Sequence, residues 1–238
     1  MSRIRWIAFD AVGTLIAPDP PVAEVYHAAG RRYGSRLTKA EVARRFREAF
    51  TREERRDLEG LTPDDWNRRD VLQTNELRER DRWRAIVCDV FGDVVDREAC
   101  LNDLWTHFAE AQSWRCYGDV APALERLRSA GLRLAVASNF DERLSGICEA
   151  LPELASLDVC MSSTRAGYRK PSGRFFLALC ETVRCGPHEV LVVGDDEIND
   201  VRAARNAGLH SRLIERARKS PSADKLSNLD DLFDGTVC

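Results

Sequence analysis

Residues 1–15 read MSRIRWIAFDAVGTL, and this opening stretch indicates the fold class. Ile4 to Phe9 is an apolar, β-rich run that stops at Asp10, and Gly13 follows three residues later. A run of this length matches one buried strand, and the glycine lets the backbone turn sharply after the carboxylate. The stretch is too short and too interrupted for a signal peptide or a membrane span, so we expect a cytoplasmic protein.

Similar short runs recur along the chain. They are Leu132 to Ala137, Leu157 to Met161, Val190 to Val193 and Ser211 to Ile214. Helical patterns separate most of them, at Ala121 to Ala130, Glu142 to Leu151, Gly173 to Val183 and Asp200 to Ala207. Strands that alternate with helices form right-handed βαβ units. The sequence therefore predicts an α/β fold, a Rossmann-like parallel sheet with helices on both faces.

The region from about Val22 to about Gln112 breaks this alternation, because it is rich in charge and has almost no strand pattern. The expected helices are Val22 to Tyr33, Lys39 to Arg56, Asp64 to Val94 with at least one break, and Arg97 to Ala111. We predict an α/β core domain of residues 1–16 and 113–238 that carries a helical subdomain at residues 17–112. The apolar pattern from Leu226 to Phe233 predicts a short docked helix in the tail.

The composition argues against some classes of protein. A net charge of -3 and a pI of about 5.9 do not fit a general nucleic-acid binder. The eight cysteines form no C-x-x-C pair, which indicates reduced thiols that fill the core. Residues 31–84 hold 16 Lys plus Arg and 12 Asp plus Glu. This basic surface is either solvated and internally paired, or it turns a few arginines toward an anionic substrate.

Polar side chains follow four of the apolar runs, where open parallel sheets bind their ligands. The four places are Asp10, Ser138 with Asn139, Lys170, and the acidic stretch Gly194 to Asp200 with Asp195, Asp196 and Asp200. Together they supply a carboxylate nucleophile, a hydroxyl and amide donor, a cation, and oxygen ligands for a hard divalent metal.

In this order and at these strand ends, the four motifs resemble those of the haloacid dehalogenase superfamily over residues 4 to 214. The helical insertion resembles the cap of that family, which shuts over the site between turnovers. The resemblance implies that Asp10 attacks an electrophilic centre in line and forms a covalent aspartyl intermediate that is later hydrolysed. In the phosphatase branch the attacked atom is phosphorus, and Mg²⁺ is needed so that a carboxylate can approach an anionic group.

The resemblance also implies roles for the remaining motif residues. Mg²⁺ is held by the Asp10 side chain, the backbone carbonyl of Val12 and the Asp195 side chain, with Asp200 or Asp196 helping directly or through water. Ser138 and the amide of Asn139 hold phosphoryl oxygens, and Lys170 neutralises charge on Asp10 and on the phosphoryl group. The expected substrate is a small molecule, an anionic phosphate ester.

The chain departs from the phosphatase pattern at Val12, where a second Asp usually protonates the leaving group and then activates water. Loss of a general acid/base costs about 10²- to 10⁴-fold in rate. One interpretation is a phosphohydrolase that is slow, confined to good leaving groups, or helped by a cap residue such as His27, Glu24 or Asp19.

Three other interpretations stay open. A 2-haloacid dehalogenase also lacks the second Asp, since halide leaves without a proton, but that branch needs no metal and usually replaces the first acid of the fourth motif, here Asp195. A phosphonate-cleaving variant needs a cap lysine, and Lys39 is the only lysine of the insertion. The last interpretation is a binding or regulatory module with little turnover.

Overall fold

The computed structural model describes residues 4–62, 65, 70–216 and 225–233. Its centre is a six-stranded sheet with the order β5-β4-β1-β6-β7-β8, in which every neighbouring pair is parallel. The strands are β1 (Trp6–Phe9), β4 (Arg133–Ser138), β5 (Val159–Ser162), β6 (Val190–Gly194), β7 (His210–Ile214) and β8 (Lys225–Leu226). The predicted α/β fold with a parallel sheet is confirmed.

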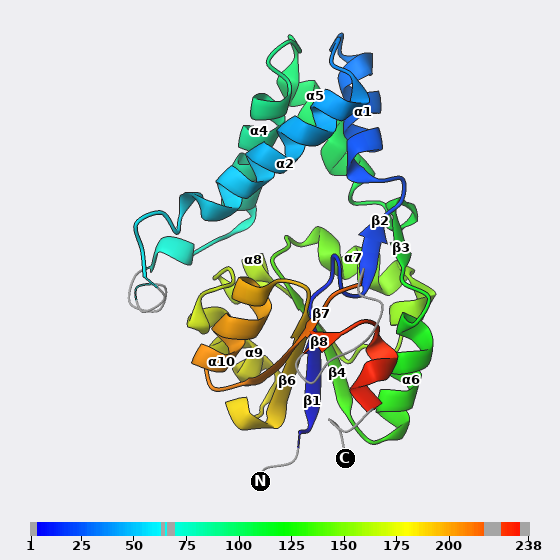
Figure 1. Cartoon of the computed structure of the whole chain (residues 1–238), viewed down its shortest axis with the longest axis vertical. Coiled ribbons are helices and arrows are strands. Elements are labelled where there is room, and N and C mark those ends of the chain that lie inside the picture. Colours follow the sequence, from blue (N-terminus) through cyan, green and yellow to red (C-terminus); the bar gives the residue numbers. More distant parts are fainter. Residues whose placement is uncertain (1–3, 63–64, 66–69, 217–224, 234–238) are drawn as a thin grey trace.

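Helices cover both faces of the sheet because its strands are apolar on both sides (Figure 1). Ile7 and Phe9 of β1 pack under α6 (Val120–Ser129) and α7 (Arg143–Ala150). Trp6 and Ala8 of the same strand point the other way. They pack with α9 (Gly173–Val183) and α10 (Ala203–Asn206). A short helix, α8 (Ser163–Ala166), follows β5.

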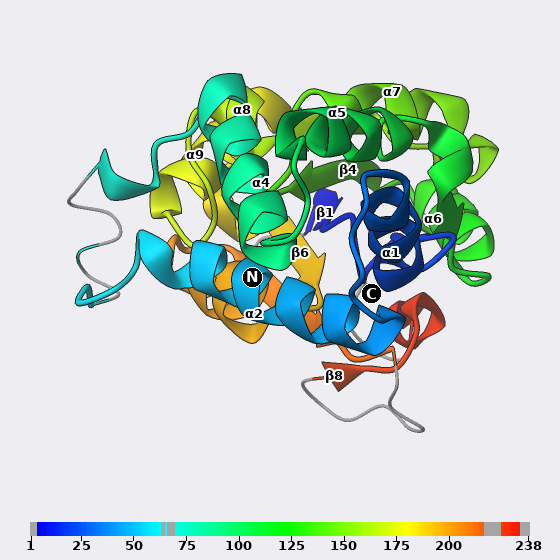
Figure 2. The same ribbon diagram turned by 90° about the horizontal axis from the view of Figure 1, so that it is seen from above.

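In the described part of the insertion, four longer α-helices lie beyond the carboxyl ends of the strands (Figure 1). They are α1 (Val22–Arg32), α2 (Lys39–Arg56), α4 (Glu76–Val90) and α5 (Arg97–His107). Seen from above, they surround the ends of β1 and β6 (Figure 2). Their apolar sides meet in a core of their own, which includes Tyr26, Val42, Ile86 and Leu101. We call these four helices the cap.

Local signals explain where the cap helices begin. Thr38 caps α2 with a full capping box, since its hydroxyl accepts from the amide of Glu41 and the Glu41 carboxylate accepts from the amide of Thr38. Asn75 and Asp96 accept in the same way at the starts of α4 and α5. No helix among the described residues is long and apolar enough to cross a membrane.

The structure adds elements that the patterns did not predict. β2 (Ile16–Pro18) and β3 (Trp114–Cys116) pair antiparallel at the two ends of the insertion. A local sequence pattern does not show these strands, because each is only three residues long and the two lie about a hundred residues apart in the chain. The ribbon spans the predicted boundaries at residues 16–17 and 112–113, so its residues could be counted with either part. The division into core and inserted subdomain therefore stays a prediction.

Three predicted helices differ from the observed elements. Residues 64 and 66–69 of the predicted Asp64 to Val94 helix lie outside the described residues, and the described helix there starts only at Glu76. The helix predicted from Asp200 to Ala207 begins earlier, as a wide π-helical turn (Glu197–Arg202) that leads into α10. The docked tail helix is a 3₁₀ turn (Leu229–Phe233) preceded by β8.

Candidate active site

Asp10 lies where the middle of the sheet meets the cap. β1 pairs with β4 on one side and with β6 on the other, so the residue after Phe9 emerges between their carboxyl ends. The amide of Asp10 still donates to the carbonyl of Val193 at 2.8 Å, which extends the strand pairing by one residue. The backbone of Asp10 is therefore fixed by the sheet, which limits the positions that its carboxylate can take.

Lys170 places a buried ammonium between two carboxylates. Its Nζ lies 2.8 Å from Oδ1 of Asp10 and 2.6 Å from Oδ1 of Asp200, and the side chain is 1% exposed. Burial opposes the charged form, but attraction to Asp10 and Asp200 outweighs it and raises the pKa of Lys170 above its ordinary value. The lysine therefore remains a cation at neutral pH.

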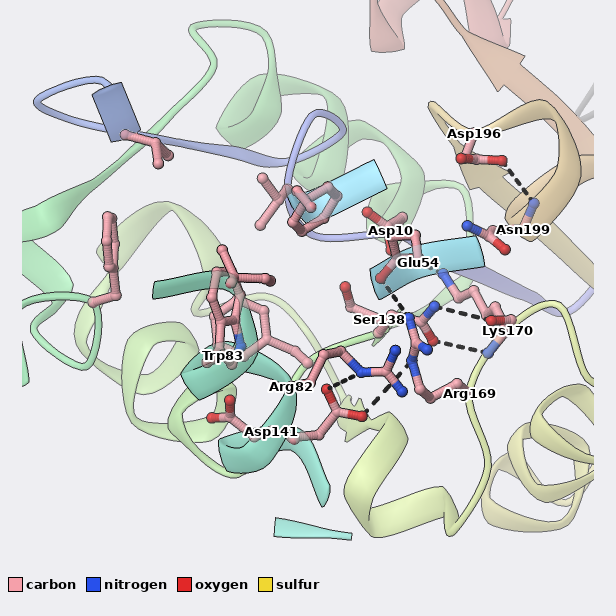
Figure 3. Close-up of a pocket in the computed structure, with 18 of the residues that line it drawn as sticks. Asp10, Glu54, Arg82, Trp83, Ser138, Asp141, Arg169, Lys170, Asp196 and Asn199 are labelled. Carbon is pink, nitrogen blue, oxygen red and sulfur yellow. Dashed lines mark hydrogen bonds and ion pairs between the residues drawn. The ribbon is translucent and has the colours of Figure 1, made fainter. Parts of the chain in front are cut away.

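Asn139 fixes the loop that carries Lys170. The Asn139 side chain accepts from the amide of Lys170 at 2.8 Å and donates to its carbonyl at 3.1 Å. Ser138, the last residue of β4, is buried and lines the same cavity. Figure 3 shows Ser138 and Lys170 close to Asp10. The structure thus brings together the residues of the first three motifs.

The fourth motif completes an acidic cluster. Oxygen atoms of Asp10, Asp195 and Asp200 all lie within 4.8 Å of one another. Glycines make this approach possible: a Cβ at Gly13, whose φ is +88°, would clash with the carboxylate of Asp195, and one at Gly194 would clash with Asp200.

The crowding shifts the acidity of two of these carboxylates. Displacement of water by the surrounding protein, followed by repulsion from Asp10 and Asp200, raises the pKa of Asp195 to about 7. Burial and the Asp10 charge likewise raise the pKa of Asp200, although Lys170 opposes them. A divalent cation among these oxygens would relieve the repulsion. The cluster therefore fits Mg²⁺, which prefers oxygen ligands.

Asp196 lies outside this cluster of three. Its carboxylate accepts from the amides of Ile198 at 2.7 Å and Asn199 at 2.8 Å, and so caps the π-helical turn (Figure 3). Both hydrogen bonds use its Oδ1, so they do not decide whether Asp196 assists a metal, and its role stays a prediction.

A cavity of about 600 Å³ separates the motif residues from the cap. Val12 lines it with an apolar side chain that also packs against the main core. His27, Glu24 and Asp19 are not among the described residues of its lining. Glu24 instead pairs with Lys39 on the exposed side of the cap. The described lining therefore includes none of these three candidates for the role of the second Asp, and Lys39 lies outside it too.

The order and geometry of these motifs match a known group of enzymes. A family model for haloacid dehalogenase-like hydrolases matches residues 4–208, nearly the whole chain. The chain belongs to the haloacid dehalogenase-like hydrolases.

Individual relatives agree with this assignment. The human haloacid dehalogenase-like hydrolase domain-containing protein 3 is 29% identical over 220 residues, which cover 89% of this chain and 82% of the human protein. A phosphoglycolate phosphatase of Nitrosospira multiformis is 36% identical over 97 residues, 40% of this chain and 42% of that enzyme. Among solved structures, the magnesium-bound putative hydrolase YfnB of Bacillus subtilis superposes with a TM-score of 0.73 at 16% identity, covering 98% of both chains. That likeness shows the shared fold.

Arg169 is a cavity residue of this haloacid dehalogenase-like hydrolase that its sequence does not reveal. Arg169, beside Lys170, is 2% exposed and reaches up from the core into three cap carboxylates. It pairs with Glu54 (Figure 3), and its nitrogens also lie 3.8 Å from Asp57 and 3.7 Å from Glu79. An arginine next to a lysine carries no pattern, and its partners lie about 90 to 115 positions away, so only the fold identifies the contact.

Other arginines of the hydrolase are paired in a similar way. Arg82 lines the cavity but donates to Asp57 at 3.0 Å. Arg143 binds the buried Asp141 at 2.6 Å and stacks over Trp105 with 3.7 Å to the ring centroid. Among the arginines of the basic segment 31–84, Arg82 therefore faces the cavity and is also paired within the protein.

Proposed function

We propose that the protein is a Mg²⁺-dependent phosphomonoester hydrolase that works through an aspartyl-phosphate on Asp10. One observation carries this proposal: the buried ammonium of Lys170 lies between Asp10 and Asp200 while Asp195 completes the acidic cluster. A cation and an acidic cluster beside one accessible carboxylate suit attack on an anionic phosphoryl group.

The residues would divide the work as follows. An oxygen of Asp10 attacks phosphorus in line, the bond from phosphorus to the ester oxygen breaks, and water later attacks the phosphorus of the aspartyl-phosphate to release phosphate. The Ser138 hydroxyl and the backbone amide of Asn139 hold phosphoryl oxygens, since the side-chain amide of Asn139 already binds Lys170. Lys170 neutralises charge at Asp10. Mg²⁺ bound by Asp10, the Val12 carbonyl and Asp195, with Asp200 or Asp196 assisting, would supply the positive charge that lets the two anions meet.

Val12 restricts this chemistry. Its side chain cannot give a proton to the departing oxygen or take one from the attacking water, and the cap offers no acid from His27, Glu24 or Asp19 in the described lining. We therefore propose turnover of esters whose leaving group departs as a stable anion, with other esters slower by about 10²- to 10⁴-fold.

Val12 also favours a second candidate, a 2-haloacid dehalogenase, because halide leaves without a proton. That reaction has no use for a metal, whereas Asp195 and Asp200 lie beside Asp10 at positions whose close approach requires Gly13 and Gly194. We therefore place it second. A binding module without turnover would keep Mg²⁺-dependent affinity for phosphate esters and lack hydrolysis.

The deciding experiment is steady-state hydrolysis of p-nitrophenyl phosphate with and without Mg²⁺. The phenolate leaves without a proton and so bypasses Val12. Asp10→Asn is the control for contaminating phosphatases, because it keeps the shape of the side chain and removes the nucleophile. Turnover that needs Mg²⁺ and vanishes in the variant supports the proposal. Absence of turnover in the wild type would make 2-chloropropionate the next substrate to test.

We also propose a cytoplasmic location and a small-molecule substrate rather than a nucleic acid. The seven cysteines in the described part of the chain are all free thiols, as in a reducing compartment.

A further inference from the structure

The cap side of the cavity is an aromatic wall, which we define as Tyr26, Phe46, Phe50 and Trp83. The rings follow one another in space, with centroids 4.8 Å apart for Tyr26 and Phe46, 5.8 Å for Phe46 and Phe50, and 6.2 Å for Phe50 and Trp83. Phe50 is 38% exposed, so its ring is partly open to the cavity that it lines. An exposed apolar ring that continues a lining of rings indicates a surface built for a ligand.

Three arginines around this wall form ion pairs with carboxylates of the protein. Arg169 is paired with Glu54, Arg82 with Asp57, and Arg143 with Asp141. Because these arginines already have carboxylate partners, a substrate hydroxyl gains only a modest hydrogen bond from them, whereas an apolar group gains the burial of its surface against the rings. The part of the cavity away from Lys170 therefore favours apolar groups. Figure 3 shows Trp83 on the other side of the pocket from Lys170.

The cavity is also large for a small ester. A volume of about 600 Å³ lies in the middle of the range found for sites that enclose drug-sized molecules. A two-carbon phosphate ester would leave most of the aromatic wall in contact with water.

We infer that the substrate is a phosphate monoester with a bulky apolar or aromatic organic group, which lies against the aromatic wall while its phosphate lies at Asp10 and Lys170. This inference rests on the proposed function and deepens it. Small polyhydroxylated phosphate esters are then poor ligands, because their hydroxyls would face rings and paired charges.

Binding of alkylphosphonates tests the inference without catalysis, since the bond from phosphorus to carbon resists displacement by a carboxylate. We would titrate methyl-, butyl- and hexylphosphonate into the protein with Mg²⁺ by calorimetry. The expected result is a gain in affinity of about fourfold for each added methylene. 3-Hydroxypropylphosphonate has the size of butylphosphonate and carries a hydroxyl in place of the last methyl group, so we expect it to bind at least tenfold more weakly.

Two variants locate the effect. Phe50→Ser removes an exposed ring and should lower the affinity for hexylphosphonate at least fivefold. The affinity for methylphosphonate should stay the same, because this ligand does not reach the ring. Leu177→Ser, at an exposed leucine of α9 outside the described cavity lining, is the matched control and should change neither. The wild-type series stands even if a variant fails to fold.

Each outcome has a distinct meaning. Affinity that does not rise with chain length, or equal binding of the butyl and hydroxypropyl ligands, overturns the inference and leaves the proposed function intact. Absence of Mg²⁺-dependent binding for every phosphonate, methylphosphonate included, overturns the proposed function and the inference with it.

Discussion

Asp195→Asn should stabilise the metal-free protein at pH 7.5 and leave its stability almost unchanged at pH 4. In the folded chain, displaced water and the carboxylates of Asp10 and Asp200 raise the pKa of Asp195 from 3.8 to about 7. Between these two pH values the folded state keeps a proton that the unfolded chain has already released. The stability contributed by this group is therefore present below about pH 4 and is lost as the pH rises toward 7.

The size of this effect follows from the shift. A rise in the pKa of this carboxyl group from 3.8 to about 7 corresponds to a loss of about 4 kcal/mol in the free energy of unfolding, if the group is fully shielded from solvent. Asp195 faces the cavity and is exposed there, so solvent screens part of the repulsion and we expect about 2 kcal/mol. For a chain of this size that corresponds to about 4 to 8 °C in the midpoint of thermal unfolding.

The assay is thermal unfolding followed by circular dichroism in EDTA, from pH 4 to pH 8. Asp195→Asn is compared with the wild type, and Asp230→Asn, an exposed ion-pair residue of the tail, is the surface control. With Mg²⁺ the wild type should have the higher thermal midpoint. The metal stabilises its ionised cluster increasingly as the pH rises, whereas the variant offers one carboxylate fewer. An advantage of the variant that is the same at pH 4 and pH 7.5 would refute the reasoning.

Three other predictions concern the same site. Val12→Asp should raise hydrolysis of an alkyl phosphate at least tenfold and that of p-nitrophenyl phosphate much less, because only the alkoxide needs a proton; equal gains for both substrates would argue against this reason. Lys170→Met should abolish turnover and lower the unfolding free energy by about 3 to 5 kcal/mol in a denaturant titration, since Asp10 and Asp200 lose their shared cation. Arg169→Met should lower the thermal midpoint by about 6 to 12 °C, the equivalent of about 3 kcal/mol, because it leaves Glu54 without its cation partner and removes the ion pair between core and cap; an unchanged midpoint would mean that the cap does not depend on this contact.

The sequence alone identified the fold and the motif residues because their signals are local. An apolar run such as Val190 to Val193 shows where a strand lies and which residues follow it, and all five predicted strands agree with the structure within two residues. The rule that parallel strands present their carboxyl ends together then brings Asp10, Lys170 and the acidic stretch to one edge. The sequence likewise predicts that Val12 stands where related phosphatases carry a proton donor.

The tertiary structure decided which side chains share the cavity, because those contacts join residues far apart in sequence. The pairing of Arg169 with Glu54 spans 115 positions, and no local sequence pattern around either residue predicts it. The aromatic wall draws on α1, α2 and α4, and a ring on an amphipathic helix gives no sign of whether it meets the cap core or the substrate. Sequence periodicity shows the apolar face of each helix, but only the packing of the helices against the sheet shows what that face touches.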